Sequence, residues 1–278
     1  MDLHLARRHR LLNRLQSVLL LVTMAGLLVL VGWLFAGALG VLWSLVLAAV
    51  VAILGPGFSP RFILRMYRAQ ELSPRQAGGL YRVVGELARR AGLSSMPRLY
   101  YVASPVLNAF ALGRDGSSHL VLSEGILRKL TPRELTGVLA HEISHIRHND
   151  TTVMGLADLF SRITGALSSA GQLLLLFNLP LIMFSDYRIN WWAIGVLIAA
   201  PAVSALIQLA LSRAREYDAD IGAAQITGDP EGLASALYKI ERYQNNMLEQ
   251  IVLPGRGVPE PSILRTHPHT RDRLERLR

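Results

Sequence analysis

Two long uncharged runs near the amino terminus constrain the fold of this chain most strongly. Residues Ser17–Phe35 contain no charged side chain, and a second uncharged run, Gly37–Leu54, follows after a single residue. A helix of about 20 apolar residues spans the hydrocarbon core of a bilayer. The first run is longer than the apolar part of a usual signal peptide. Together the runs predict a retained transmembrane hairpin.

The distribution of arginine predicts the orientation of this hairpin. Arginines stand before the first run at positions 7, 8, 10 and 14, and after the second run at positions 61, 65 and 68. Because basic residues favour the cytoplasmic side of a membrane, we expect both outer ends of the hairpin in the cytoplasm. Such flanks also explain the net charge of +9. The pattern of alternating basic and aromatic residues that is typical of a nucleic-acid-binding surface is not found in the sequence, so we expect no nucleic-acid partner.

Two further apolar segments complete the predicted membrane part. Gly155–Phe184 is interrupted by Asp158 and Arg162, which lie one helical turn apart. If the segment spans the membrane, these two residues should pair with each other or face protein or the interface. Trp191–Leu211 is a stronger span. With 51% hydrophobic residues and a mean hydropathy of +0.32, the chain is too apolar for an ordinary soluble domain. We therefore predict about four transmembrane helices, as hairpins in residues 1–54 and 151–211.

The remaining residues, 55–150 and 212–278, predict one cytoplasmic domain in two parts. Leu80, Val84 and Leu87 recur at helical spacing before Gly92, which can end a helix. Two later segments, residues 98–113 and 119–127, are rich in β-branched and aromatic residues. The pattern predicts strands here, with Arg114–Ser117 as the turn between the segments. A small sheet with a hairpin is expected here. The fold class is thus a mainly α integral membrane protein with a cytoplasmic α+β domain.

A helix with a strong start signal carries the pattern HEISH. Thr131 and Glu134 have the spacing of a capping box. His141 and His145 then lie one turn apart on one helix face, so both rings can bind one metal ion, and Glu142 projects beside them without ligating. The chain has no cysteine, so histidines and carboxylates must supply any ligands. The pattern favours a zinc peptidase over two surface histidines on an amphipathic helix.

A third ligand is expected after the last apolar segment. Glu216 completes a set of two histidines and one glutamate, which leaves the fourth zinc position for water. Asp220 lies one turn further on and can accept a hydrogen bond from the outer nitrogen of a ligating histidine. Without the upstream histidines, both would read as solvated carboxylates beside Arg213 and Arg215.

These motifs resemble the HtpX-like membrane zinc metalloproteases, which are related to the CAAX prenyl proteases. The matching pieces, in order, are the amino-terminal hairpin, Asn108–Ala111, HEISH with Asp150, a second hairpin, Glu216 with Asp220, Thr266–Pro268 and Arg273. The two metal-ligand motifs separated by membrane spans are specific, and the other pieces are weaker. His148 departs from the family pattern, in which asparagine is often found at this position, so the resemblance implies no role for it.

The resemblance implies a zincin-type protease with one Zn²⁺ per chain, in a bacterial cytoplasmic (inner) membrane. The active site and both termini would face the cytoplasm, and the substrates would be misfolded or damaged membrane proteins. Asn108 and Ala109 would match the strand that aligns the substrate, and His267 and Arg273 would lie near the active site, at the substrate or the oxyanion. The sequence carries no signal for the oligomeric state.

Glu142 is expected to act as the general base that takes a proton from the attacking water. Three alternatives stay open. An intramembrane protease would hold its metal helix in lipid, which Arg133, Glu134 and Arg147 disfavour. A prenyl-protein protease would need a larger membrane chamber than four spans suggest. A noncatalytic adaptor or chaperone would use the metal to staple two helices, with a fourth protein ligand.

Overall fold

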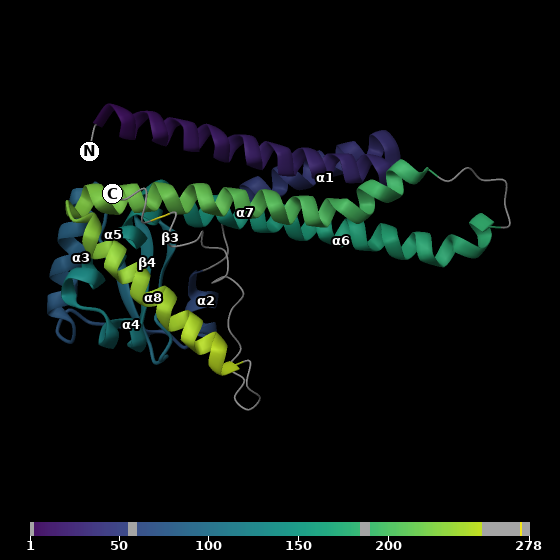
Figure 1. The fold of residues 1–278 in the computed structure, drawn as a ribbon. Coiled ribbons are helices and arrows are strands. Elements are labelled where there is room, and N and C mark those ends of the chain that lie inside the picture. The colour runs from purple at the N-terminus through teal and green to yellow at the C-terminus, as the bar shows by residue number, and fades with distance from the viewer. Residues whose placement is uncertain (1–2, 55–59, 184–189, 252–272, 274–278) are drawn as a thin grey trace. The chain divides into compact units, whose positions relative to one another are not determined.

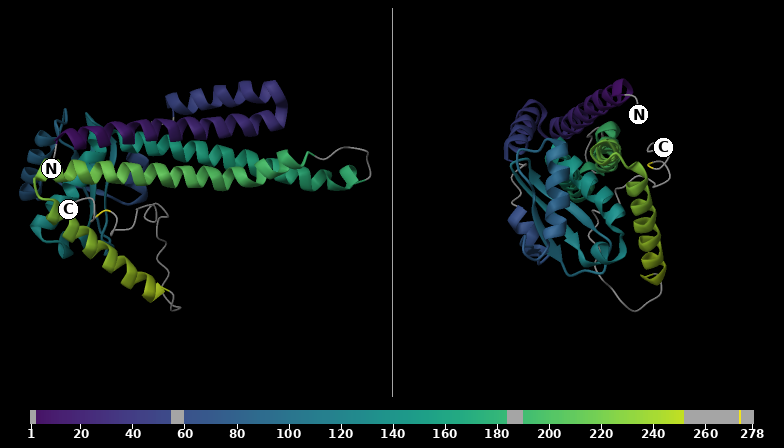
Figure 2. Two further views of the ribbon diagram at one scale, coloured as in Figure 1. Left: turned by 45° about the horizontal axis from the view of Figure 1, so that its top comes forward. Right: turned by 90° about the vertical axis from the view of Figure 1, so that its left-hand side faces the viewer.

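The structure is a computed structural model that describes residues 3–54, 60–183, 190–251 and 273 (Figures 1 and 2). Its elements group into two compact units. The first contains residues 1–10, 58–152 and 213–278, and the second contains residues 11–57 and 153–212. The division into four segments expected from the sequence stays a prediction.

In the second unit, helix α1 (Leu3–Leu54) folds back on itself. Ala36 and Gly37 leave the helical conformation, and Gly37 has a φ of +56°, in the left-handed region that glycine adopts without strain. The two halves then pack closely, because a Cβ atom on Gly40 would collide with the carbonyl of Gly32. The predicted helical hairpin is therefore present (Figure 2).

Helices α6 (Asp150–Met183) and α7 (Trp191–Thr227) supply the other apolar segments. Within the described residues, three helices are long and apolar enough to cross a membrane, over Leu15–Val50, Asp150–Asn178 and Trp191–Thr227. The first of these includes the bend of α1. Asp158 and Arg162 form the expected ion pair at 2.7 Å. The predicted end of the third span at Phe184 lies outside the described residues.

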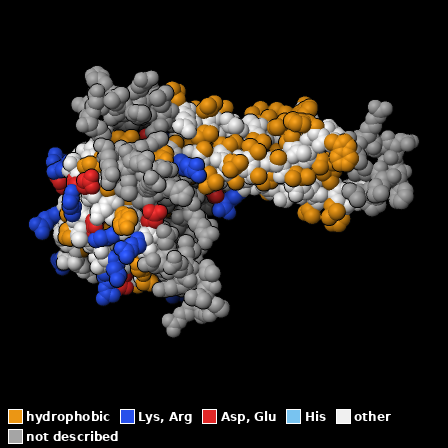
Figure 3. Space-filling view, viewed as in Figure 1, with side chains coloured by type: hydrophobic (Ala, Val, Ile, Leu, Met, Phe, Trp, Pro, Cys, Tyr) orange, Lys and Arg blue, Asp and Glu red, His pale blue; other side chains and the backbone are white. Residues whose placement is uncertain are grey.

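The second unit exposes apolar side chains and buries only a narrow seam between its helices. Met24 and Leu28 of α1 pack against Ala157 and Phe160 of α6 and Leu211 of α7. In Figure 3, hydrophobic side chains are spread along the visible surface of these helices, whereas charged side chains gather on the first unit. Lipid chains are the solvent that suits such a surface.

The first unit contains a four-stranded sheet in the order β1-β2-β4-β3. Strands β3 (Ala109–Arg114) and β4 (Ser117–Ser123) form the predicted antiparallel hairpin, with Gly116 at a φ of +86° in the turn. Strand β2 (Arg98–Val102) pairs in parallel with β4, and the short strand β1 (Gln70–Glu71) is antiparallel to β2. Strand β3 is therefore at one edge of the sheet.

Helices cover both faces of this sheet. The larger core lies on one face, where Leu99, Leu120 and Leu122 pack with side chains of the helices. These helices are α3 (Gly78–Ala91), α4 (Glu124–Lys129), α5 (Pro132–His148), the end of α7, and α8 (Pro230–Ile251). On the other face, Leu64 of the short helix α2 (Pro60–Met66) packs against β3 and β4.

The start of α5 is anchored by the predicted capping box. The Thr131 side chain accepts a hydrogen bond from the Glu134 N–H, and Glu134 accepts one from the Thr131 N–H at 2.8 Å. Glu134 also accepts hydrogen bonds from Ser235 and Lys239 of α8. Burial alone raises the pKa of Glu134, but these partners outweigh burial and lower it to about 2. The helix that carries HEISH is thus fixed to α8 at its first turn.

Candidate metal site

Helix α5 brings the two histidine rings of HEISH together. His141 and His145 lie one turn apart, with their Nε2 atoms separated by 3.1 Å. The rings stand nearly perpendicular, at 89°, with centroids 4.6 Å apart. His141 is buried and His145 is half-buried. The i and i+4 spacing therefore gives the shared face expected from the sequence.

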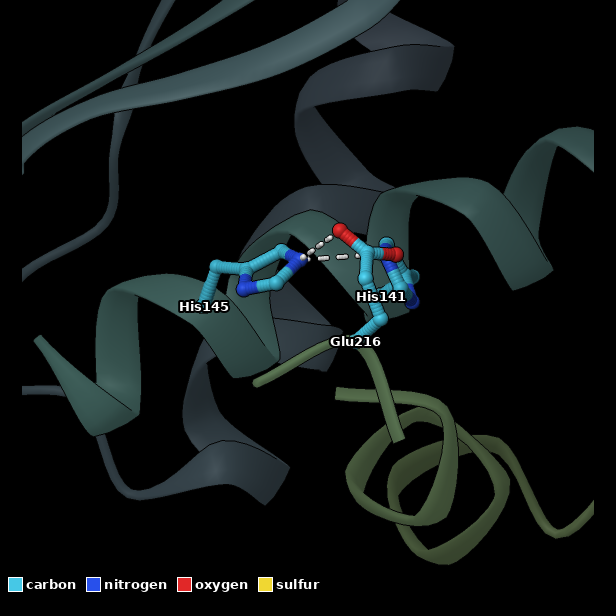
Figure 4. Close-up of side chains that lie close together, drawn as sticks. All are labelled: His141, His145 and Glu216. Carbon is cyan, nitrogen blue, oxygen red and sulfur yellow. Dashed lines mark hydrogen bonds and ion pairs between the residues drawn. The ribbon is translucent and has the colours of Figure 1, made fainter. Parts of the chain in front are cut away.

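Helix α7 supplies the third group. Glu216 Oε2 lies 3.4 Å from His141 Nε2, and Glu216 Oε1 lies 3.7 Å from His145 Nε2. Figure 4 shows the carboxylate of Glu216 pointing toward the two rings. One ligand atom from each of the three residues lies within 4.8 Å of the others, so the group could hold a metal ion.

A close helix contact lets α7 reach the rings. Gly222 of α7 lies against Ser144 of α5, and a Cβ atom on Gly222 would collide with the Ser144 hydroxyl. Glycine therefore allows a separation of the two helices that a larger residue would increase. Glu216 stands six residues earlier on the same helix, so this contact helps to set its distance from His141.

The outer nitrogen of each histidine faces a buried carboxylate. His141 Nδ1 lies 3.0 Å from Asp220 Oδ1, and His145 Nδ1 lies 2.7 Å from Asp150 Oδ2. Such partners fix the tautomer of a ring and direct its Nε2 atom toward a metal. The sequence singled out Asp220 for this position. Asp150 entered the sequence prediction only as part of the family motif that follows HEISH, although its contact with His145 is equivalent to that of Asp220 with His141.

Two buried arginines hold these carboxylates in turn. Arg273 pairs with Asp220 through two nitrogens, at 2.6 and 2.7 Å, and lies 3.3 Å from Glu216. Arg215 lies 2.7 Å from Asp150, and it also pairs with Asp218 at 3.1 Å. The contact of Arg215 with Asp150 was not predicted from the sequence. The position of Arg215 one residue before Glu216 was the available signal.

The cluster strongly favours positive charge on the histidines. Burial alone lowers the pKa of His141, but the carboxylates of Asp220 and Glu216 outweigh burial and raise it to about 10. Burial likewise opposes protonation of His145, and the hydrogen bond with Asp150 leads to a net raised pKa. A cation bound between the rings would take the place of this protonic charge.

The other residues expected at the site are only partly described. Glu142 is half-buried next to His141, and its charge acts on Arg273. Ala109 opens edge strand β3, which packs against α5, and Asn108 immediately precedes it. His267 lies outside the described residues, so its expected position near the site stays a prediction.

Comparisons with known proteins agree with the site. The family model described as "Peptidase family M48" matches residues 74–278. A protein named "Protease HtpX homolog" from Paraburkholderia phytofirmans is 37% identical over 280 residues, which cover 95% of this chain and 96% of the relative. "Protease HtpX" from Legionella pneumophila is 34% identical over 287 residues, which cover 96% of this chain and 99% of the relative.

A solved structure shares the fold. The crystal structure of S. mikatae Ste24p matches with a TM-score of 0.53 and 22% sequence identity. The match covers 98% of this chain and 66% of that chain, so that protein is considerably longer. The family resemblance that the motifs predicted is confirmed by the full-length relatives.

Proposed function

Because the chain belongs to peptidase family M48 and is a membrane metallopeptidase, we propose that it is a zinc-dependent endopeptidase. His141, His145 and Glu216 would be the three protein ligands. The convergence of these residues from α5 and α7 is the observation that carries the proposal. Three protein ligands characterise a catalytic zinc site, whereas a structural staple uses four.

The spacing of the three ligand atoms fits zinc. Tetrahedral zinc bonds of about 2.0–2.2 Å require ligand atoms about 3.3–3.6 Å apart. The two Nε2 atoms lie 3.1 Å apart, and each lies near one oxygen of the Glu216 carboxylate, at 3.4 Å for His141 and 3.7 Å for His145. One ligand atom from each residue lies within 4.8 Å of the others, so a modest adjustment of the side chains would give this spacing. Two imidazoles and one carboxylate are also a common zinc donor set, and the carboxylates behind both rings support the same assignment.

Glu142 would act as the proton carrier. It follows His141 on α5 and is half-buried, so it can accept a proton from the attacking water and pass it to the leaving amine. Zinc bound beside it supplies the positive charge that acidifies this water and polarises the substrate carbonyl. Arg273 would position Asp220, and through it His141, rather than meet the substrate directly, because its guanidinium already holds two carboxylates.

Strand β3 offers a way to hold an extended substrate. The Ser123 N–H donates a hydrogen bond to the Asn108 carbonyl at 3.0 Å, so Asn108 faces β4. Antiparallel pairs alternate between hydrogen-bonded and non-hydrogen-bonded residues. The main-chain groups of Ala109 and Ala111 should therefore face the free edge of the sheet. A peptide that added a strand there would pair with the backbone of the enzyme.

The setting supports membrane proteins as substrates. The apolar helices favour an integral membrane protein, and the bacterial relatives favour the inner membrane of a bacterium. The arginines that flank the first hairpin favour a cytoplasmic active site. The resemblance to the HtpX-like membrane metalloproteases implies a role in the removal of misfolded or damaged membrane proteins, and the relatives named as HtpX proteases belong to that group. We place a prenyl-protein protease second, since nothing in the described residues indicates a chamber for an isoprenoid chain.

Metal removal tests the zinc-dependent endopeptidase. Purified full-length protein in detergent should cleave unfolded casein, lose that cleavage after treatment with 1,10-phenanthroline, and recover it when one equivalent of Zn²⁺ is restored. Metal analysis should find about one zinc per active chain. Glu142→Gln protein purified in the same way controls for contaminating proteases, because it carries the same contaminants without the proposed general base. Cleavage that persists after complete removal of the metal would contradict the proposal.

Metal binding should release protons near neutral pH. The pKa of His141 is raised to about 10 in the metal-free protein, so its ring is protonated at pH 7.5 and must lose that proton to bind a metal. Zinc affinity should therefore fall by about tenfold or more for each unit of decreasing pH below 10. Calorimetry in two buffers of different ionisation enthalpy should report at least one proton released per zinc. His119→Gln should release the same number, and zero release would refute the assignment.

A further inference from the structure

A polar pocket lies in the first unit, between helix α2 and the sheet. Its volume is about 610 Å³, which is in the range of small-molecule sites. Arg61 of α2, Arg98 of β2 and His119 of β4 line it, together with Ser118 and Tyr100. None of these residues belongs to the candidate metal site, so the pocket requires an explanation of its own.

The pocket has buried polar atoms that lack protein partners. Ser118 is only 3% exposed, and its Oγ atom has no hydrogen-bond partner among the described residues. The same is true of the Nδ1 atom of His119. A buried polar group without a partner costs free energy, and such groups usually meet a bound molecule or water. Two of them in one pocket point to a polar ligand.

The charges around the pocket favour an anion. Arg61 and Arg98 have no carboxylate within 4 Å in the described part of the chain. Burial, followed by the charges of Arg98 and Arg61, lowers the pKa of His119, whereas the charge of Glu71 acts in the opposite direction. The histidine ring is therefore neutral near pH 7 and can donate one N–H. The two positive charges of Arg61 and Arg98 exceed the one negative charge of Glu71, so the charges that act on His119 are positive in sum.

We propose that this pocket binds a phosphate-bearing ligand, with Arg61 and Arg98 holding the phosphate and Ser118 and His119 completing its hydrogen bonds. Guanidinium groups match the oxygens of phosphate through paired hydrogen bonds. A free phosphate ion would fill only a small part of 610 Å³. The ligand is thus a phosphate with an attached organic group.

An anionic phospholipid headgroup is the source that the surroundings favour. Phe62 and Met66 on α2 are 65% and 60% exposed, and they lie one turn apart, so they present apolar side chains together. In the sequence, α2 begins six residues after the end of α1, which is an apolar helix. Basic residues beside exposed apolar residues are typical of segments at a membrane interface.

Native mass spectrometry of the full-length protein in detergent would test this site. Dioleoyl phosphatidylglycerol should bind, and the apparent Kd should rise by about tenfold or more in Arg61→Gln and in the Arg61→Gln/Arg98→Gln double variant. Arg65→Gln is the matched control, because Arg65 is an exposed arginine of α2 that does not line the pocket. It should change the Kd by less than about twofold. Casein cleavage by Arg61→Gln should equal that of the wild type.

Two further probes separate the possible sources. If sn-glycerol 3-phosphate binds with the same dependence on Arg61 and Arg98, the phosphate site stands and the ligand is soluble. If only phosphatidylglycerol binds with a dependence on Arg61 and Arg98, the ligand is a lipid headgroup. The proposal is overturned if the Arg61 variant binds both probes as the wild type does, or if oleate, which has a carboxylate, shows the arginine dependence and the phosphates do not.

Discussion

Glu142→Gln should bind zinc as tightly as the wild-type chain and cleave casein about 100- to 10,000-fold more slowly, the range expected for loss of a general base. Glutamine keeps the size of the side chain but cannot accept the proton of the attacking water. The residue follows His141 on α5 and is not one of the three clustered ligands, so the metal should stay. The loss should appear in kcat/KM, with metal content measured on the same samples.

The matched control for this variant is Glu231→Gln. Glu231 is an exposed glutamate in the first turn of α8, and the substitution removes the same charge. It should leave both activity and metal content unchanged. A Glu142→Gln protein that retained full activity with bound zinc would show that another group accepts the proton, and the proposed mechanism would be wrong.

Glu216→Ala should lose both the metal and the activity. Structural zinc sites bind with roughly 10–16 kcal/mol shared among four ligands, so removal of one ligand should weaken binding by at least about 100- to 1,000-fold. The carboxylate lies 3.4 Å and 3.7 Å from the two histidine nitrogens, and no other described carboxylate joins this cluster. Competition with a chromophoric zinc chelator would measure the affinity.

A graded series strengthens this test. Asp220→Asn and Asp150→Asn should weaken zinc binding by only about 10- to 100-fold, because these residues hold the outer nitrogens of the histidines. Glu231→Ala is the matched control for a lost carboxylate. Wild-type zinc affinity in Glu216→Ala, in a protein that melts at the wild-type temperature, would remove Glu216 from the site and with it the proposed ligand set.

Local signals in the sequence predicted the parts of the site that depend on one helix. The capping box at Thr131 and Glu134 predicted the start of α5, and the four-residue spacing of His141 and His145 predicted their shared face. The bend at Gly37 followed from two uncharged runs with almost no loop between them. These features depend on periodicity and end signals, which a sequence states directly.

Long-range contacts were less accessible to prediction. Arg215 reaches Asp150 across 65 positions, and an arginine beside a predicted membrane span looks like an ordinary basic flank. Helix α2 was not predicted for the same reason, because Arg61 and Arg65 have the pattern of basic residues that follow a membrane hairpin. A pairwise contact of this kind leaves no periodic pattern, so one sequence cannot distinguish it from solvent exposure.

The free edge of β3 suggests how such an enzyme would distinguish unfolded substrates from folded proteins. The backbone groups of a polypeptide must be free of their own hydrogen bonds before they can form hydrogen bonds with the main chain of Ala109 and Ala111. In the proposed binding mode, an intact helix in lipid would be spared whatever its side chains are, because its backbone groups are already hydrogen-bonded within the helix. Loss of folding would itself mark a chain for destruction, whatever its amino-acid composition.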